Sequence, residues 1–214
     1  MSAEPDRKLR GLYFVTPEVP AGADPLATHC RNAEAALRGG ARLIQFRDKS
    51  RAGPEREAVA RALVGMAHAH AASCIINDDV ALAARIQADG VHLGRDDSDP
   101  IAARGRLGPN ALIGVSCYNE LDRAHAAEMA GADYVAFGAV FPSPTKPAAV
   151  QADLDLLRRA RAELTGPICA IGGITPDNAP AVVAAGAGLL AVIQGISAAP
   201  DPEAAARRIS GLFD

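Results

Sequence analysis

The chain has 214 residues, of which 49% are hydrophobic and 22% are charged, as is ordinary for a globular protein. Its 22 Lys and Arg residues nearly balance 25 Asp and Glu residues, and the formal charge of −3 argues against nucleic acid as a partner. No apolar run approaches the roughly 18 residues of a membrane span, and the polar start "MSAEPDRKLRG" does not resemble a signal peptide. We therefore expect a cytoplasmic protein that binds neither membranes nor nucleic acid.

The four cysteines form no metal-binding or redox motif. Cys30, Cys74, Cys117 and Cys169 are far apart, and none belongs to a C-x-x-C pair. The last three lie inside apolar runs, where Cys usually behaves as a small buried hydrophobe. This pattern fits a reducing compartment.

Short apolar runs alternate with Ala-rich segments along the whole chain. The runs cover 11–16, 42–48, 74–78, 90–94, 112–117, 134–140, 167–174 and 189–196. Apolar residues recur at helical spacing between the runs, in segments such as 54–71, 119–130, 150–164 and 176–185. In the last segment we expect Thr175 to cap a helix, Pro176 to occupy its first turn and Gly186 to end it.

This strict alternation predicts parallel strands that are covered by helices. Eight such units predict an α/β fold, a closed (β/α)₈ or TIM barrel, at the small end of its usual size. An open doubly wound sheet is the alternative, which the even spacing disfavours. Nothing resembles a linker, so we expect one domain over 1–214, with 1–10 as an N-terminal extension. A homo-oligomer is compatible with the sequence.

Cations gather where two of the predicted strands end, which is where such barrels carry their reactive groups. Gln45, Arg47 and Lys49 are spaced by two, so they point the same way while the chain stays extended. Lys146 follows the sixth run, in "FPSPTKP". A single cation at a strand end is most often a solvated surface charge. Three at one mouth favour an anionic ligand.

Glycine-rich turns follow the seventh and eighth runs. Gly172, Gly173 and Gly195 allow backbone N–H groups to approach a phosphate closely, at the usual phosphate position of this fold. The sequence therefore predicts a second phosphate region, separate from the cationic one.

Carboxylates follow the third and fourth runs, which should be neighbouring strands. Asp78 and Asp97 would lie side by side next to cations, and such a pair suits Mg²⁺, which takes one or two carboxylates together with water and phosphate oxygens. The alternative is that these acids cap the following helices. That alternative is stronger for their neighbours Asp79 and Asp96.

The histidines offer less. His92 lies in the middle of a run and is interpreted as a packed barrel residue, whereas His29 and His125 are expected on helix surfaces. His68 and His70 are two apart in a helix, so they cannot share a face. No Ser-His-Asp or Cys-His set can be assembled, and the predicted site lacks an obvious general base.

Taken together, six of these stretches resemble the thiamine phosphate synthase family, and the resemblance covers nearly the whole chain. They are "LIQFRDK", "IIND", "GVHLGRDD", "IGVSC", "VFPSPTKP" and "AIGGIT", each at a predicted strand end. The resemblance implies a transferase of thiamine biosynthesis that joins a pyrimidinylmethyl diphosphate to a hydroxyethylthiazole phosphate and releases diphosphate. It also implies Mg²⁺ as cofactor and these two small molecules as partners.

The resemblance implies a role for particular residues of this chain. Asp78 and Asp97 would bind the metal, and Arg47, Lys49 and Lys146 would be catalytic by neutralising the leaving diphosphate. The substrate-binding residues would be Gln45, Arg47, Lys49, Asn77, Ser116, Ser143, Pro144, Thr145, Lys146, Gly173, Ile193 and Gln194.

The chain departs from the family pattern at three positions. Arg95 stands where Gln is usual, Ser143 replaces a Thr, and Gln194 replaces a Ser at the thiazole phosphate. A related thiazole tautomerase is one alternative, but it is expected to lack the pattern of Asn77, Asp78 and a loop lysine. A phosphate-ligand sensor and a phosphate isomerase on the same barrel are the others. The isomerase would need an acid–base pair at the mouth.

Overall fold

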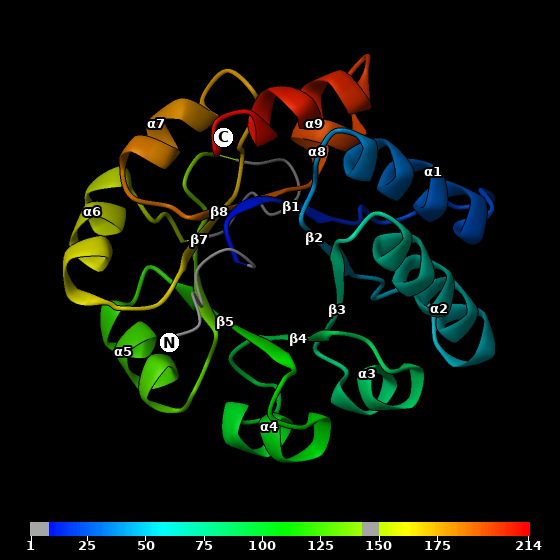
Figure 1. Ribbon diagram of the computed structural model, residues 1–214, viewed down its shortest axis with the longest axis horizontal. Coiled ribbons are helices and arrows are strands. Elements are labelled where there is room, and N and C mark those ends of the chain that lie inside the picture. Colours follow the sequence, from blue (N-terminus) through cyan, green and yellow to red (C-terminus); the bar gives the residue numbers. More distant parts are fainter. Residues whose placement is uncertain (1–8, 143–149) are drawn as a thin grey trace.

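The computed structural model describes residues 9–142 and 150–214, which form a closed barrel of parallel strands surrounded by helices (Figure 1). Each strand pairs with the next in chain order, and the last strand pairs with the first. The predicted TIM barrel is confirmed, and the open sheet is excluded. The strands are β1 (Gly11–Val15), β2 (Leu43–Phe46), β3 (Ser73–Asn77), β4 (Gly90–Leu93), β5 (Leu112–Tyr118), β6 (Tyr134–Gly138), β7 (Ile168–Ile171) and β8 (Leu189–Val192).

The helices form the outer layer and follow the strands in turn, with two of them after β8 (Figure 1). Within the described ranges no helix is both long enough and apolar enough to cross a membrane. The helices are α1 (Pro25–Arg38), α2 (Gly53–Ala69), α3 (Val80–Ile86), α4 (Pro100–Leu107), α5 (Leu121–Met129), α6 (Leu154–Glu163), α7 (Ala179–Ala184), α8 (Gln194–Ser197) and α9 (Pro202–Ser210).

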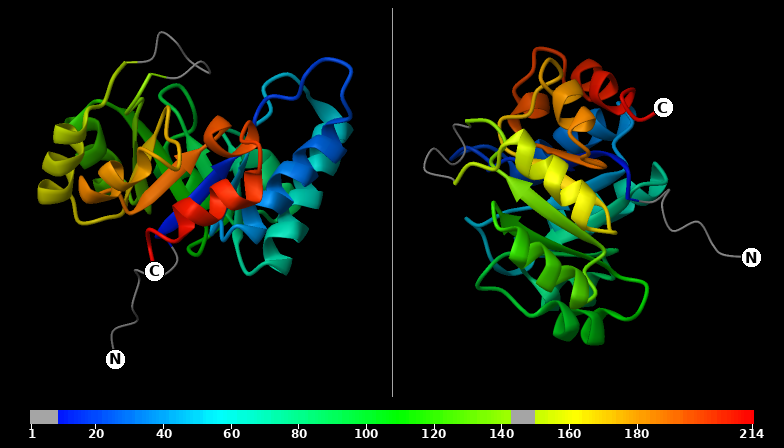
Figure 2. Two further views of the ribbon diagram at one scale, coloured as in Figure 1. Left: turned by 90° about the horizontal axis from the view of Figure 1, so that it is seen from above. Right: turned by 90° about the vertical axis from the view of Figure 1, so that its left-hand side faces the viewer.

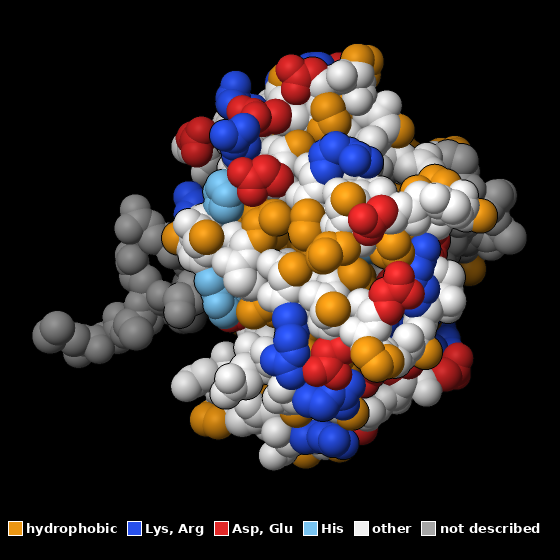
Figure 3. Space-filling model, turned by 90° about the vertical axis from the view of Figure 1, so that its right-hand side faces the viewer, with side chains coloured by type: hydrophobic (Ala, Val, Ile, Leu, Met, Phe, Trp, Pro, Cys, Tyr) orange, Lys and Arg blue, Asp and Glu red, His pale blue; other side chains and the backbone are white. Residues whose placement is uncertain are grey.

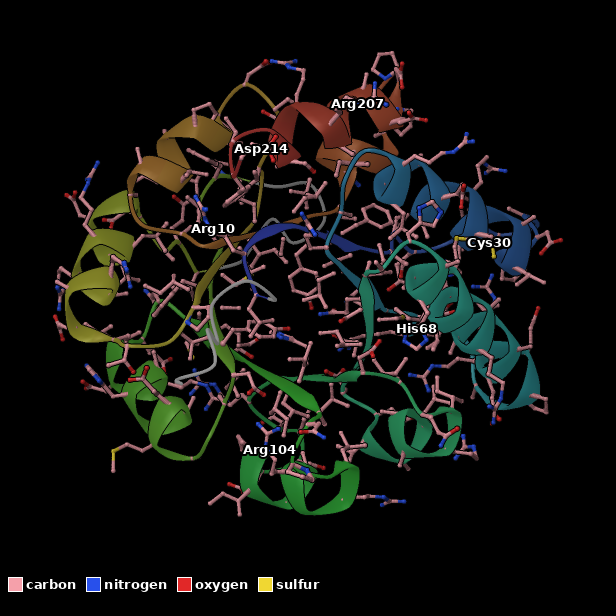
Figure 4. The ribbon with its side chains drawn as sticks, in the orientation of Figure 1. Arg10, Cys30, His68, Arg104, Arg207 and Asp214 are labelled. Carbon is pink, nitrogen blue, oxygen red and sulfur yellow. The ribbon has the colours of Figure 1, made fainter. Side chains whose placement is uncertain are left out.

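The strands divide their side chains between two cores, because successive residues of a strand point to opposite faces. In β1, Leu12 and Phe14 belong to the large core between barrel and helices, and Tyr13 and Val15 belong to the core inside the barrel. Side chains project into this interior (Figure 4), where ten buried residues pack as one cluster. The predicted burial of Cys74, Cys117 and Cys169 is confirmed, whereas Cys30 lies part-buried on α1.

Gly114 makes room inside the barrel for the ring of Tyr134. A Cβ atom on Gly114 would stand 2.0 Å from Cζ of Tyr134, which is 1% exposed and held edge-to-face against Tyr13 with 5.9 Å between ring centroids. The ring has nowhere to move, so the absence of a side chain in β5 fixes how far the tyrosine of β6 reaches across the barrel.

Aspartate side chains define where several helices begin. Asp24, Asp99, Asp153 and Asp201 each accept a hydrogen bond from a backbone N–H in the first turn of the following helix. These bonds satisfy N–H groups that have no acceptor within the helix.

The expected start of α7 is wrong. The helix begins at Ala179, after a turn in which the side chain of Asn178 accepts the N–H of Thr175 at 2.8 Å and donates to the carbonyl of Gly173 at 2.9 Å. Asn178 therefore shapes the loop after β7, and Thr175 does not cap the helix. Gly186 follows the helix with φ of 106°, as expected for its exit.

The two ends of the barrel differ. Seen from the side, the loops after the strands lie at one end and the C-terminus lies at the other (Figure 2). On the face formed by α1 and α2, hydrophobic side chains gather in the middle, with acidic and basic side chains around them (Figure 3). Ion pairs on the helices include Glu57 with Arg61 of α2 at 2.8 Å and with Arg85 of α3 at 2.7 Å. Such exposed pairs contribute little to stability.

We predict that Gly114→Ala lowers the free energy of unfolding by about 2 kcal/mol or more, because the new methyl group overlaps a buried ring that cannot move. Thermal or urea unfolding measures the change. Gly65→Ala in α2 is the matched control: nothing lies within 4 Å of its Cβ position, so about 0.5–1 kcal/mol of stabilisation is expected. Equal stability of the two variants would contradict the packing described for Tyr134.

Candidate functional site

A cavity of about 360 Å³ opens where the strands end. All eight strands, or the residues directly after them, contribute to its wall. The wall is mostly apolar with a few polar side chains, which is typical of a small-molecule site. The lining residues are Tyr13, Val15, Gln45, Arg47, Asn77, His92, Ser116, Tyr118, Ala136, Gly138, Ala139, Val150, Cys169, Ile171, Gly172, Ala191 and Ile193.

Arg47 is fixed at the cavity wall directly after β2. Its backbone N–H donates to Thr16 Oγ1 at 2.9 Å, and the Thr16 hydroxyl donates back to the Arg47 carbonyl at 3.1 Å. The guanidinium donates to Glu18 Oε1 at 2.7 Å. Glu18 lies in the loop after β1 and is a partner that sequence reasoning missed. The position of the Arg47 cation is thus fixed by these contacts, and its carboxylate partner Glu18 is half exposed.

The side chain of Lys49 does not point the same way as those of Gln45 and Arg47. Because β2 ends at Phe46, the extended spacing does not reach Lys49, which lies outside the cavity wall and is 57% exposed. Its Nζ atom is 3.1 Å from Asp78 Oδ2. The cation is therefore beside the carboxylates, at the edge of the mouth.

Asp78 and Asp97 follow the adjacent strands β3 and β4. The backbone N–H of Asp78 donates to the His92 carbonyl at 2.9 Å, and Asp97 Oδ2 accepts the N–H of Gly94 at 2.7 Å. Desolvation, together with the neighbouring Asp78 carboxylate, raises the pKa of Asp97. The predicted pairing of the two carboxylates is therefore present, and their mutual repulsion would be relieved by a cation.

The helix-capping alternative applies to only one of the four acids. Asp79 caps α3, where its Oδ1 accepts the N–H of Leu82 at 2.8 Å and its Oδ2 pairs with Arg56 at 2.7 Å. Asp96 does not cap α4, because that role belongs to Asp99. Asp79 thus has a structural role, whereas Asp78 and Asp97 lie at the candidate site.

The donor set restricts which metal could bind. In the part of the chain that is described, no three or more His, Cys, Asp or Glu side chains gather as a metal site. Asp78 and Asp97 offer two hard carboxylates, which fit Mg²⁺ when substrate phosphate and water complete its shell. They do not fit a structural zinc site, which needs four protein ligands of the Cys or His type.

Five polar side chains form a continuous hydrogen-bonded row across the barrel interior, which we call the polar row: Gln45, Tyr13, Tyr134, His92 and Ser116. The Gln45 amide donates to the Tyr13 hydroxyl, which lies 3.0 Å from the Tyr134 hydroxyl. The Tyr134 hydroxyl is 3.0 Å from His92 Nδ1, and His92 Nε2 is 2.8 Å from Ser116 Oγ. The row forms the polar floor of the cavity.

The polar row shows what sequence reasoning missed. His92 is buried in the barrel as expected, but it also lines the cavity. Tyr13 and Tyr134 were not singled out, although alternation along β1 places Tyr13 on the same interior face as Val15. Burial raises the pKa of both tyrosines well above the ordinary value, so both hydroxyls keep their protons.

The loops after β7 and β8 require glycine. Gly172 and Gly173 have φ of 107° and 63°, and a Cβ on Gly173 would stand 2.5 Å from the Pro142 carbonyl oxygen. A Cβ on Gly195 would stand 2.2 Å from the Ile174 carbonyl oxygen. Within the described residues no acceptor takes the N–H of Gly173.

Tyr118 is a further cavity residue that the sequence did not reveal. It ends β5 at a shift of the strand register and has φ of 55°, an unusual conformation for an aromatic residue. The guanidinium groups of Arg95 and Arg123 lie 5.0 and 6.0 Å from its ring centroid. Arg95 also pairs with Glu120, so this departure from the family pattern serves at the rim as a partner of Tyr118.

Some of the remaining predicted residues line the cavity, and others do not. Asn77, Ser116 and Ile193 line the cavity, whereas Gln194 begins α8 and is exposed. Ser143, Pro144, Thr145 and Lys146 lie outside the described residues.

The histidine expectations are partly wrong. His29 is fully buried on the inner face of α1, with its ring edge-to-face against Phe46 at 5.3 Å. The helical spacing of His29, Ala33 and Ala36 predicts this face, but the polar side chain suggested a surface position. His125 is on the surface as expected, 3.3 Å from Glu163.

We predict that Asp79→Ala lowers the free energy of unfolding by about 1–2 kcal/mol, because it removes the cap of α3 and the partner of Arg56. Asp78→Asn is the matched variant and should change stability by less than about 0.5 kcal/mol, because Asp78 caps no helix and its pair with Lys49 is exposed. Denaturant unfolding in metal-free buffer compares the two. A larger loss of stability for Asp78→Asn than for Asp79→Ala would assign the structural role to Asp78 instead.

The chain is similar to proteins of one family along nearly its whole length. A family model described as thiamine monophosphate synthase matches residues 12–196. A thiamine-phosphate synthase of Thioalkalivibrio sulfidiphilus is 56% identical over 99% of this chain and 99% of its own length. That of Aromatoleum aromaticum is 52% identical over 98% of this chain and 99% of its own length.

Solved structures agree. A thiamine phosphate pyrophosphorylase from Pyrococcus furiosus has a TM-score of 0.85 and 32% identity, with 97% of this chain and 96% of that chain covered. A 3-hexulose-6-phosphate synthase has a TM-score of 0.69 at 20% identity, with 95% of this chain and all of that chain covered, and shares the fold alone.

Proposed function

The chain belongs to the thiamine monophosphate synthase family and is a transferase of thiamine biosynthesis, and on this premise we propose how its barrel mouth performs the reaction. The substrates would be 4-amino-2-methyl-5-pyrimidinylmethyl diphosphate and hydroxyethylthiazole phosphate. The observation that carries the proposal is the carboxylate pair of Asp78 and Asp97 beside Lys49, next to a cavity with a floor of polar side chains.

The pyrimidine ring would lie over the polar floor, near Gln45, Asn77 and Ser116. Its diphosphate would then extend toward Arg47 and Lys49. The cavity supports this division, because Arg47 is the one Lys, Arg, Asp or Glu residue among the described residues that line it. A flat apolar ring and a highly charged group would each meet a surface of matching character.

Mg²⁺ would be held by Asp78 and Asp97. When bound, it would supply positive charge to the diphosphate oxygens. Lys49 would share this task, since its contact with Asp78 keeps it beside the metal position. Arg47 would bind the diphosphate from the side of β2, in exchange for its contact with Glu18.

The chemistry would proceed through departure of the diphosphate. The C–O bond breaks with its electron pair leaving on the diphosphate, and the ring amino group stabilises the pyrimidinylmethyl cation that remains. The thiazole nitrogen then donates its lone pair to form the new C–N bond. No proton has to be removed, so the site needs charge neutralisation and alignment of two reactants rather than a strong base.

The thiazole phosphate would bind at the glycine loops. The N–H of Gly173, which has no acceptor among the described residues, and the backbone at Ile193 and Gln194 support this position, because a phosphate is well held by amide donors at a helix start. We further propose Lys146 as a catalytic cation, with Ser143, Pro144 and Thr145 beside it in sequence as substrate-binding residues. These four assignments rest on the family resemblance.

We predict that the purified protein makes thiamine phosphate from the two substrates only when Mg²⁺ is present, with the product followed as its fluorescent thiochrome derivative. Asp78→Asn and Asp97→Asn should each raise the Mg²⁺ concentration for half-maximal activity by on the order of tenfold or more, because each removes a carboxylate ligand. Asp96→Asn is the matched control and should leave the titration unchanged. An unchanged titration for Asp78→Asn would remove Asp78 from the metal site.

We predict that Arg47→Ala raises the KM for the pyrimidine diphosphate roughly ten- to hundredfold, because a charge-assisted contact to the diphosphate is lost. The KM for the thiazole phosphate should stay near its wild-type value. Arg51→Ala is the control, since Arg51 lies in the same loop but pairs with Asp48. An equal rise in both KM values would indicate general damage to the mouth.

The remaining alternatives make different products. A thiazole tautomerase would isomerise its substrate without the pyrimidine diphosphate, and a sensor would bind the thiazole phosphate without turnover. Magnesium-dependent release of diphosphate in the same assay would exclude both.

A further inference from the structure

In the polar row, the donor and the acceptor of each hydrogen bond can be assigned in turn, starting from Gln45. The Gln45 amide donates to the Tyr13 oxygen, so the Tyr13 hydroxyl must find its acceptor elsewhere. The acceptor beside it is the Tyr134 oxygen at 3.0 Å. Because a buried donor without an acceptor is costly, Tyr13 donates to Tyr134.

The same reasoning continues toward β5. The Tyr134 oxygen accepts from Tyr13, and its own hydroxyl donates to His92 Nδ1 at 3.0 Å. Because Nδ1 accepts this hydrogen bond, the N–H of His92 is on Nε2, which donates to Ser116 Oγ at 2.8 Å. The Ser116 oxygen is then an acceptor within the row, and its hydroxyl hydrogen is left for the cavity that Ser116 lines.

We propose that Tyr13 and Tyr134 are positioning residues that set the polarity of the pocket floor. Tyr134 holds His92 in the Nε2–H tautomer and thereby presents Ser116 as a donor, while Tyr13 holds the Gln45 amide nitrogen and leaves its carbonyl oxygen as an acceptor. This inference rests on the proposed function. It specifies what the pocket floor recognises in the substrate: a flat ring with a nitrogen acceptor on the β5 side and an N–H donor on the β2 side.

A 4-aminopyrimidine carries both features, an acceptor in its ring nitrogens and a donor in its amino group. A ring with the opposite arrangement is a pyrimidinone that carries N–H where the aminopyrimidine carries a lone pair. It would place a donor against the Ser116 donor, or an acceptor against the Gln45 acceptor. Such unmatched polar groups are strongly rejected in a water-poor site. The row therefore provides selectivity without any charged group.

Packing keeps the row in place. Gly114 leaves space for the Tyr134 ring, the His92 ring stacks on it at 5.6 Å, and the Tyr13 ring meets it edge-on. Because these contacts involve the rings, a Tyr→Phe change removes a hydroxyl and keeps the packing. This makes the two tyrosines suitable for a test that separates polarity from structure.

The test is a double-mutant cycle on binding of 4-amino-5-hydroxymethyl-2-methylpyrimidine, a probe without diphosphate, measured by calorimetry. Tyr134→Phe and Ser116→Ala should each weaken binding about five- to tenfold, and the double variant should bind no more weakly than Ser116→Ala alone. Tyr13→Phe and Gln45→Ala form a second cycle with the same expectation. Ser210→Ala, at the other end of the barrel, is the hydroxyl-deletion control and should change nothing.

Kinetics supply the second readout. Tyr134→Phe should raise the KM for the pyrimidine diphosphate by a similar factor and leave the KM for the thiazole phosphate unchanged. Additive losses in both cycles, or equal rises in both KM values, would overturn the proposal, because a merely structural role produces them. Failure of the proposed function is separate: wild-type protein would then bind the probe and respond to the variants without making thiamine phosphate.

Discussion

A parallel sheet that closes on itself sends alternate side chains into one narrow interior, and the other features of the site depend on this constraint. A polar residue on an interior position has to find its partners on other strands. Gln45, His92 and Ser116 lie on three such positions, and Tyr13 and Tyr134 connect them. The closure also brings the strand ends to one mouth, so residues distant in sequence meet there.

The sequence allowed the barrel, the order of its strands and the pairing of Asp78 with Asp97 to be predicted, because these depend on periodicity and on neighbouring strands in chain order. The strand ends were predicted less well: the runs 42–48 and 189–196 extend beyond β2 and β8. It did not reveal Glu18 as the partner of Arg47, because that contact depends on the path of two loops. The polar row was missed for another reason: its two central links, from Tyr13 to Tyr134 and from Tyr134 to His92, join strands that are not neighbours, and only the closed barrel brings them together. His29 was misjudged by its polarity when its helical spacing was the better guide.

The mouth balances its own charges before any ligand arrives. Arg47 is paired with Glu18, Lys49 with Asp78 and Arg95 with Glu120, each through a partly exposed carboxylate. An anion must therefore displace carboxylates to reach these cations, and a weakly charged anion gains little from the exchange. A diphosphate, with several charges and many oxygens, can replace more than one partner at once. The arrangement favours polyanions over the single carboxylates and halides that are abundant in solution.

The crossed rings of Tyr13 and Tyr134 also decide where the cavity ends. They meet edge-to-face at 89°, and Tyr13 lines the cavity while the buried Tyr134 supports it. Eight strands fix the radius of such a barrel, and nothing in the backbone fixes its depth. In this protein the depth is a property of two side chains and of the glycine that admits one of them. The room for a ring in this cavity is therefore limited from within the barrel by Tyr13, far along the chain from the loops that carry Asp78 and Asp97.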